Sequence, residues 1–117
     1  MNIADVAKHY AVGSPLEKVS AALEVLAPGG GPLTLEQLSG FDDFHTAGRM
    51  ATVRMAELLS PGPGDVVLDA GSGLGGPARY LADRFGCRVI GLDLTPEFVA
   101  IGNLLNERTG MGDRVER

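Results

Sequence analysis

The sequence predicts an α/β protein in which N-terminal helices are followed by the first half of a parallel sheet. Apolar residues before residue 60 recur at helical spacing, whereas short apolar runs and helical patterns alternate after it. A glycine-rich turn joins the first apolar run to the helix that follows it. A Gly/Pro cluster at residues 60–64 separates the two parts. We therefore expect a helical cap or lid over residues 1–60 and the sheet domain over residues 61–117.

The first part of the chain is expected to contain four helices. A helical pattern over residues 3–10 ends at Gly13, and Ser14 and Pro15 cap and begin the next helix. Thr34 begins a shorter helix with a second capping sequence, and residues 46–59 form another. The expected apolar stripe of the second helix is Leu16, Val19, Leu23 and Leu26, and the core residues expected of the last are Ala47, Met50, Ala51, Val53, Leu58 and Leu59.

Strands and helices are expected to alternate in the second part. Residues 66–68 predict a buried parallel strand, and residues 88–93 predict the next one. Pro77 opens the helix between them and Gly86 ends it; Thr95 caps a further helix with Pro96 at its first position. Residues 113–117 begin a third strand. The expected buried residues of the two helices are Ala78, Leu81, Ala82 and Phe85, and then Phe98, Ile101 and Leu105.

The charge and composition of the chain exclude several classes of function. The net charge is −5 and the ten cations are scattered, so no basic surface is available to neutralise nucleic-acid phosphates. No apolar stretch approaches the roughly 20 residues of a membrane span, and no signal peptide is visible, so we expect a cytoplasmic protein without a membrane span. One cysteine, Cys87, excludes an internal disulfide and a cysteine-based zinc site, and we expect no metal.

The chemistry is expected in the turn Asp69-Ala70-Gly71-Ser72-Gly73-Leu74-Gly75-Gly76. A glycine-rich turn between a strand and a helix lets the backbone approach a ligand closely. Gly71, Gly73 and Gly76 fit the dinucleotide pattern G-x-G-x-x-G, whereas Gly71, Gly73 and Gly75 fit G-x-G-x-G. The glycines alone therefore leave the ligand open.

Two carboxylates separate the candidate ligands. Asp93 ends the second strand, 18 residues past Gly75, where a carboxylate accepts hydrogen bonds from ribose hydroxyls and disfavours a 2′-phosphate. Asp69 ends the first strand, where it would repel the pyrophosphate of a dinucleotide. S-adenosylmethionine carries a cationic sulfonium and an ammonium group instead. The two carboxylates therefore favour S-adenosylmethionine.

These motifs resemble those of a known family. Residues 66–82 are similar to the first motif of class I S-adenosylmethionine-dependent methyltransferases, and residues 91–99 to the second. Residues 41–52 resemble the entry segment of the type 11 group, which includes ubiquinone/menaquinone-biosynthesis methyltransferases and glycine, sarcosine and dimethylglycine N-methyltransferases. The resemblance covers residues 41–117 well and the first 40 loosely. It implies a Rossmann-like fold and methyl transfer to a small-molecule acceptor.

The resemblance also implies roles for individual residues. The backbone from Gly71 to Gly75, with Asp69, would surround the methionine moiety; Asp93 would bind the ribose, and Leu94 would lie against the adenine. In the family, an acidic residue after the third strand contacts the adenine amine, and a motif after the fourth strand borders the substrate. This sequence includes neither, so we expect an N-terminal portion of an enzyme that transfers methyl groups weakly or not at all by itself. No catalytic residue is identified. The expected cofactor-binding residues are Asp69, Gly71, Ser72, Gly73, Gly75, Asp93 and Leu94.

Other polar and reactive side chains receive plainer interpretations. His45 is expected to be a surface or capping residue, and Tyr10 a packing aromatic. Arg49 either pairs with the methionine carboxylate or lies exposed on its helix. Arg79 and Asp83, four residues apart, are expected to form a solvated pair of little energetic weight. Cys87 is expected to be a small buried hydrophobe. Where the family often has two glycines, this chain has Ala47-Gly48, which leaves close backbone approach at residue 47 unsupported.

Two alternatives remain open at this stage. The same glycines suit a fragment of an NAD-dependent oxidoreductase, and the chain also suits a non-catalytic cofactor-binding or interaction module. Because a sheet of two strands and the start of a third leaves an exposed strand edge, we further expect self-association through that edge.

Overall fold

The computed structural model describes residues 15–38 and 48–117, with the side chain of Arg49 outside that description. Several predictions therefore lie outside the described residues. They are the helix over residues 3–10 with Tyr10, the cap at Ser14, the core position of Ala47, and the roles weighed for His45 and Arg49.

Capping sequences define the two helices before residue 39. Helix α2 (Pro15–Leu26) begins at Pro15 as predicted, and a short 3-10 turn, η1 (Pro28–Gly30), follows it. Helix α3 (Leu35–Leu38) begins with the expected capping sequence: the Gln37 amide donates to Thr34 Oγ1, and the Thr34 amide donates to Gln37 Oε1 over 2.9 Å. The predicted apolar stripe of α2 is confirmed for Val19 and Leu23, which are buried. It is wrong for Leu16 and Leu26, which are exposed.

Helix α4 (Gly48–Leu59) exists where it was predicted, but its buried face differs from the prediction. Thr52 and Ala56 are its buried residues, whereas Met50, Leu58 and Leu59 are exposed. Apolar side chains occur on more than one side of this helix, so the sequence pattern did not define a single face. Small side chains let α4 approach α5 closely, and that contact selects the Thr52–Ala56 side.

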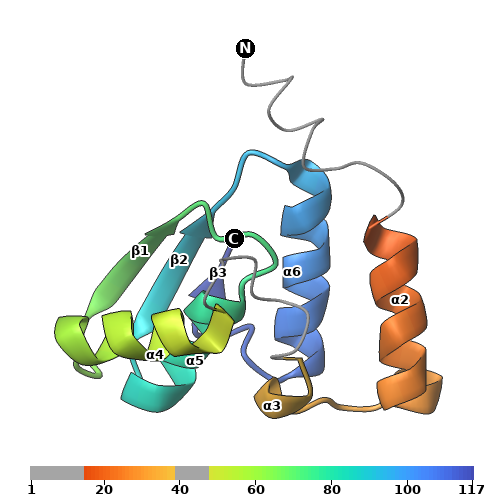
Figure 1. The fold of residues 1–117 in the computed structure, drawn as a ribbon, viewed down its shortest axis with the longest axis horizontal. Coiled ribbons are helices and arrows are strands. Elements are labelled where there is room, and N and C mark those ends of the chain that lie inside the picture. Colours follow the sequence, from red (N-terminus) through yellow and green to blue (C-terminus); the bar gives the residue numbers. More distant parts are fainter. Residues whose placement is uncertain (1–14, 39–47) are drawn as a thin grey trace.

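Two strand–helix units form a parallel sheet. The elements are β1 (Val66–Ala70), α5 (Gly76–Phe85), β2 (Arg88–Leu92), α6 (Pro96–Arg108) and β3 (Val115–Glu116). The strand order is β1-β2-β3, and both strand pairs are parallel, as predicted. The arrowheads of β1 and β2 point to the same edge of the sheet, where the turn into α5 and the loop into α6 begin (Figure 1). That edge is where the site residues gather.

One face of the sheet carries a core. Ala78, Leu81 and Ala82 of α5 are buried as predicted, and Phe85 is half-buried. They pack in one cluster with Ala56 of α4, with Cys87, with Val89 of β2, and with Met111 and Val115. Gly86 ends α5 with a φ of 68°, which confirms the predicted stop.

The other face of the sheet carries exposed apolar side chains. Val66 and Leu68 point to the same face because strand residues alternate, and each is 63% exposed. The prediction that β1 is buried is therefore wrong for the described residues. β1 lies at the end of the sheet, and the helices that the structure describes pack on the Val67 and Val89 side.

Helix α2 is fastened to α6 along its length. The two helices lie side by side in Figure 1 and share a core that includes Leu23 of α2, the predicted Phe98, Ile101 and Leu105 of α6, and Leu74 of the turn. At one end, the Leu16 amide donates to Glu97 Oε1 over 3.1 Å. At the other end, Arg108 Nη2 donates to the Gly31 carbonyl over 2.7 Å, and the Leu33 amide donates to the Arg108 carbonyl. Residues 15–38 thus form a layer packed on the sheet domain.

Candidate functional site

The glycine-rich turn depends on left-handed backbone conformations. Gly71, Gly73 and Gly75 have φ angles of 72°, 56° and 92°. Residues with a Cβ rarely adopt the left-handed φ/ψ region, so glycine is strongly favoured at each of the three positions. The Gly71 and Ser72 amides both donate to the Leu92 carbonyl over 2.8 Å, which ties the turn to the end of β2.

Gly75 is the position at which the two glycine patterns differ. The dinucleotide pattern leaves this position to any residue. Here Gly75 caps α5, and a Cβ built on it would lie 2.7 Å from Arg117 Nη1 and 2.9 Å from Arg79 Nη1. The conformation at residue 75 therefore favours glycine, and a side chain there would also displace two guanidinium groups, which favours the G-x-G-x-G pattern for the turn.

Asp93 joins the two loops of the site. It follows β2, is half-buried, and its Oδ2 accepts a hydrogen bond from the Gly73 amide over 2.8 Å. Its Oδ1 accepts a hydrogen bond from the Thr95 amide over 3.0 Å, at the start of α6. Thr95 is the N-cap residue of α6 and Pro96 the first helical residue, as predicted, but the Thr95 side chain makes no cap hydrogen bond. Each carboxylate oxygen keeps a second lone pair for a further donor.

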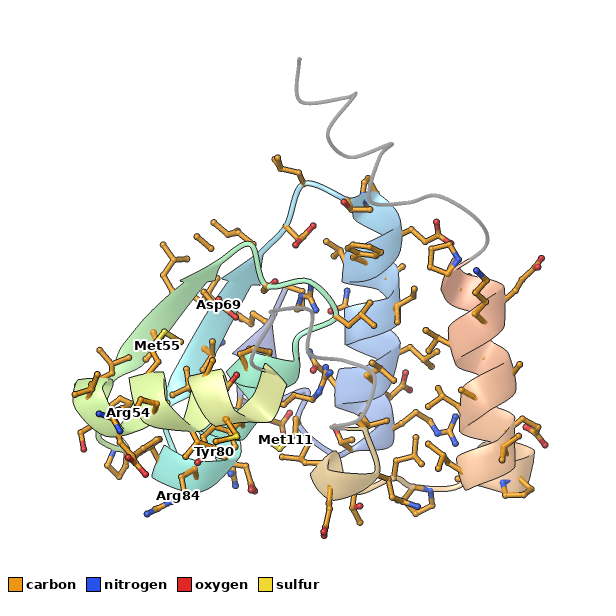
Figure 2. All side chains as sticks on the ribbon, in the orientation of Figure 1. Arg54, Met55, Asp69, Tyr80, Arg84 and Met111 are labelled. Carbon is orange, nitrogen blue, oxygen red and sulfur yellow. The ribbon has the colours of Figure 1, made fainter. Side chains whose placement is uncertain are left out.

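Asp69 and Ser72 lie on the side of the sheet that carries α5. Asp69 pairs in register with Gly91 of β2, and its Oδ2 is buried (labelled on β1 in Figure 2). A Cβ built on Gly91 would lie 2.8 Å from Ser72 Oγ, so glycine at 91 makes room for the serine side chain. Ser72 is buried, and its hydroxyl has no hydrogen-bond partner among the described residues. The turn thus carries buried polar oxygens at the ends of β1 and β2.

Leu92 and Leu94 flank Asp93 and are both about half exposed, at 53% and 51%. An exposed apolar side chain beside a carboxylate is suited to contact a planar ring whose sugar the carboxylate holds. The structure therefore brings Leu94 to the same edge of the sheet as Asp93, Asp69 and the three glycines.

The sequence analysis missed the buried side chains beneath the turn. Arg79 is 1% exposed, and its Nη1 donates to Asn106 Oδ1 over 2.9 Å; the predicted solvated pair with Asp83 is therefore wrong. Asn106 Nδ2 in turn donates to the Val115 carbonyl of β3 over 3.3 Å. Spacing along a helix cannot reveal such a link across three elements, although an arginine within the apolar face of α5 was a usable signal.

Arg117 lies next to Arg79 and beneath the same turn. Its Nη2 donates to the Gly73 carbonyl. Burial, together with the neighbouring charge of Arg79, lowers the pKa of the Arg117 guanidinium, whereas the charges of Asp93 and Asp69 act in the opposite direction. The turn is therefore surrounded by two carboxylates and two guanidinium groups, and its electrostatics depend on all four.

The remaining described residues offer no second centre of chemistry. Cys87 is buried, its Sγ donates to the Leu81 carbonyl over 3.5 Å, and burial raises the pKa of its thiol, as expected of a packing residue. In the part of the chain that the structure describes, no three His, Cys, Asp or Glu residues gather in a way that would hold a metal ion. A search of the same residues found no helix of sufficient length and apolar character to span a membrane.

Comparisons with known proteins show which proteins this chain resembles. Residues 68–116 match the family model of a methyltransferase domain. The chain is 46% identical over 52 residues to a sterol 24-C-methyltransferase of Eremothecium gossypii, covering 44% of this chain and 14% of that protein. It is 38% identical over 71 residues to a sarcosine/dimethylglycine N-methyltransferase of Halorhodospira halochloris, covering 60% of this chain and 25% of that protein.

A solved structure shows the same fold. Phosphoethanolamine N-methyltransferase 2 of Haemonchus contortus, in complex with S-adenosyl-L-methionine, matches with a TM-score of 0.58 and 29% identity, over 70% of this chain and 19% of that one. The chain spans a quarter or less of the length of the two curated relatives above. The predicted Rossmann-like fold and the predicted resemblance are both confirmed. The chain is therefore similar to the class I S-adenosylmethionine-dependent methyltransferases, and its residues 68–116 match a methyltransferase domain.

Proposed function

We propose that the turn from Asp69 to Gly75 binds S-adenosylmethionine. The observation that carries the proposal is the hydrogen bond from the Gly73 amide to Asp93 Oδ2, because it fixes a bare glycine backbone beside a carboxylate at the end of β2. Gly71, Gly73 and Gly75, which all have positive φ angles, carry no Cβ that would separate this backbone from a ligand. The likeness to a methyltransferase that was solved with S-adenosyl-L-methionine supports the same ligand.

Each proposed site residue has a physical role in this arrangement. Asp93 accepts the ribose hydroxyls with the lone pairs that Gly73 and Thr95 leave open, and Leu94 covers the adenine ring. The backbone of Gly71, Ser72, Gly73 and Gly75 lies along the methionine moiety. Asp69 provides negative charge near the cationic methionine end, and its buried Oδ2 increases that effect because burial reduces solvent screening.

We further propose that the whole protein transfers a methyl group to a small-molecule acceptor. The cofactor supplies an electrophilic methyl group, and the protein positions the acceptor and excludes water. The relatives described above are named as methyltransferases of sterols, sarcosine and dimethylglycine, and phosphoethanolamine, which supports a small-molecule acceptor. No catalytic residue is assigned among the described side chains.

Isothermal calorimetry tests the ligand. We expect S-adenosylmethionine to bind the 117-residue chain and NAD to produce no heat beyond dilution. Asp93→Ala should weaken S-adenosylmethionine at least tenfold, because it removes both the ribose acceptor and the bond to Gly73. Asp83→Ala is the matched control, because Asp83 is an exposed carboxylate on α5. Tight NAD binding without a response to S-adenosylmethionine would instead support an oxidoreductase fragment.

The proposal includes the setting of the domain. We propose residues 1–60 as a helical cap or lid and residues 61–117 as the first part of the cofactor-binding domain. The net charge of −5 supports a protein without a nucleic-acid partner, and the single cysteine fits a reducing compartment such as the cytoplasm. Limited proteolysis with and without S-adenosylmethionine tests the lid, because a lid that closes on the cofactor becomes protected when the cofactor binds.

We also propose that the chain by itself self-associates through β1. Val66 and Leu68 on this strand are 63% exposed, and an apolar strand at the end of a sheet readily pairs with another chain. Light scattering should give a mass that increases with concentration. Leu68→Lys should reduce that mass, whereas Val25→Lys, at an even more exposed apolar position on α2, should leave it unchanged. A monomer at all concentrations would refute the proposal.

A further inference from the structure

A buried polar network lies beneath the turn. Arg79 and Asn106 are both buried, and their hydrogen bond links α5 to α6. Arg79 Nη1 also lies 3.5 Å from the Gly102 carbonyl of α6, and Asn106 Nδ2 donates to the carbonyl of Val115 in β3. A buried guanidinium needs such acceptors, since leaving its donors unpaired is costly. The network therefore joins three separate elements next to the turn.

Arg117 occupies a space that glycines keep open. A Cβ built on Gly102 would lie 1.8 Å from Arg117 Nη1, and one built on Gly91 would lie 3.3 Å from Arg117 Cδ. With Gly75 of the turn, three glycines from three parts of the chain border this side chain. The Arg117 side chain therefore extends from the end of β3, through the space beside these glycines, to the turn.

Gly73 is the residue of the turn that the Arg117 guanidinium contacts. Its carbonyl accepts a hydrogen bond from Arg117 Nη2, and its amide donates to Asp93 Oδ2. Holding both the amide and the carbonyl of one residue fixes the two peptide planes on either side of its Cα. The φ of 56° at Gly73 is then maintained by side chains from two different strand ends.

We propose that Arg117 is a positioning residue that fixes the backbone of the turn at Gly73 and thereby sets the affinity for S-adenosylmethionine. The second half of this inference rests on the proposed function; the first half does not. Arg117 acts through the Gly73 carbonyl and need not touch the ligand. Burial and the nearby charge of Arg79 both disfavour the charged form of Arg117. The hydrogen bond to Gly73 therefore explains the buried guanidinium better than a gain in stability does.

The experiment compares three variants of the full chain with the wild type. Arg117→Met keeps an unbranched, mostly apolar side chain and removes the donors. Arg117→Lys keeps a donor, and Arg88→Met is the matched control, because Arg88 forms an exposed ion pair with Glu116 at the neighbouring strand. Three properties are measured: amide hydrogen exchange at Gly73 without ligand, the midpoint of thermal unfolding, and calorimetric affinity for S-adenosylmethionine.

We expect Gly73 exchange and ligand affinity to change while the unfolding midpoint does not. Arg117→Met should accelerate Gly73 exchange at least tenfold and weaken S-adenosylmethionine about tenfold, while its unfolding midpoint is no lower than that of Arg88→Met. Arg117→Lys should recover part of both losses. Gly102→Ala should also accelerate Gly73 exchange, because its Cβ meets the Arg117 guanidinium and lies 3.1 Å from the Leu74 carbonyl of the turn. If Arg117→Met fails to fold, Arg117→Lys decides the question, because it changes the guanidinium alone.

Each half of the inference can fail separately. Unchanged Gly73 exchange in Arg117→Met would overturn the positioning role whatever the ligand does. Faster exchange with unchanged affinity would overturn the link to the cofactor. If the wild type does not bind S-adenosylmethionine, the proposed function and the cofactor half of the inference both fail, and the exchange at Gly73 still tests the positioning half.

Discussion

Asp93 and Gly73 are 20 residues apart in the chain, and the carboxylate of one accepts a hydrogen bond from the amide of the other over 2.8 Å. This bond joins the end of β2 to the turn after β1, so the two conspicuous motifs of the sequence are one structural unit. Any change at Asp93 therefore acts on the shape of the turn as well as on a bound ligand.

Asp93→Asn is expected to lower the free energy of unfolding by about 1–3 kcal/mol. The amide group retains one acceptor oxygen, so either the Gly73 or the Thr95 amide loses its partner. Urea unfolding followed by circular dichroism measures the effect. Asp113→Asn is the control at an exposed loop position and should change stability by less than about 0.5 kcal/mol. Equal stability of the two variants would contradict the proposed link.

Gly75→Ala is expected to be more damaging than the same change at Gly110. Both glycines have positive φ angles, at 92° and 71°, so both variants pay for backbone strain. Only at Gly75 does the new Cβ meet the two guanidinium groups, whereas nothing lies within 4 Å of a Cβ at Gly110. In thermal unfolding, the free energy of unfolding of Gly75→Ala should therefore be about 1–3 kcal/mol lower than that of Gly110→Ala. Indistinguishable variants would mean that the space beneath the turn is not filled.

Leu23→Ala tests whether residues 15–38 are part of the folded domain. Leu23 is 2% exposed and packs in the core between α2 and α6, so its truncation should cost about 2–4 kcal/mol. Val25 on the same helix is 82% exposed, and Val25→Ala should change stability by less than about 0.5 kcal/mol. Chemical denaturation of the two variants provides the comparison. A small effect of Leu23→Ala would mean that α2 is not stably docked on α6.

Cys87 predicts a pH dependence of stability. Burial raises the pKa of its thiol in the folded state, so the unfolded chain ionises first as the pH rises. Its contribution to stability is therefore complete below the pKa of the unfolded thiol and decreases as the pH rises toward the folded value. Urea midpoints between about pH 8 and pH 10 should fall less steeply in Cys87→Ala than in the wild type. Parallel curves would show that the folded state does not disfavour the thiolate.

The elements of the fold could be predicted because their ends carry local signals. Pro15, Pro96 and Gly86 act within a few residues of their own positions, and the Thr34–Gln37 capping pair formed as its spacing indicated. The parallel order of the strands follows from their alternation with helices. These predictions needed no knowledge of how the elements pack.

The failures came from contacts between distant parts of the chain. The buried face of α4 depends on α5, and the exposure of Val66 and Leu68 depends on which helices cover the sheet. Arg79 lies in a sequence pattern that equally suits a solvated pair, and only the approach of Asn106 from α6 makes it a buried residue. The glycines and Asp93 were singled out from the sequence, whereas their connection to each other required the fold.

The most direct test of the account is a backbone-amide NMR titration of the chain with S-adenosylmethionine, with NAD as the comparison ligand. The account predicts saturable chemical-shift changes concentrated at Gly71, Ser72 and Gly73 and at residues 93–95, with no comparable response to NAD. Shifts scattered away from the turn, or a response at these amides to NAD alone, would contradict the claim that this turn and its two carboxylates bind S-adenosylmethionine.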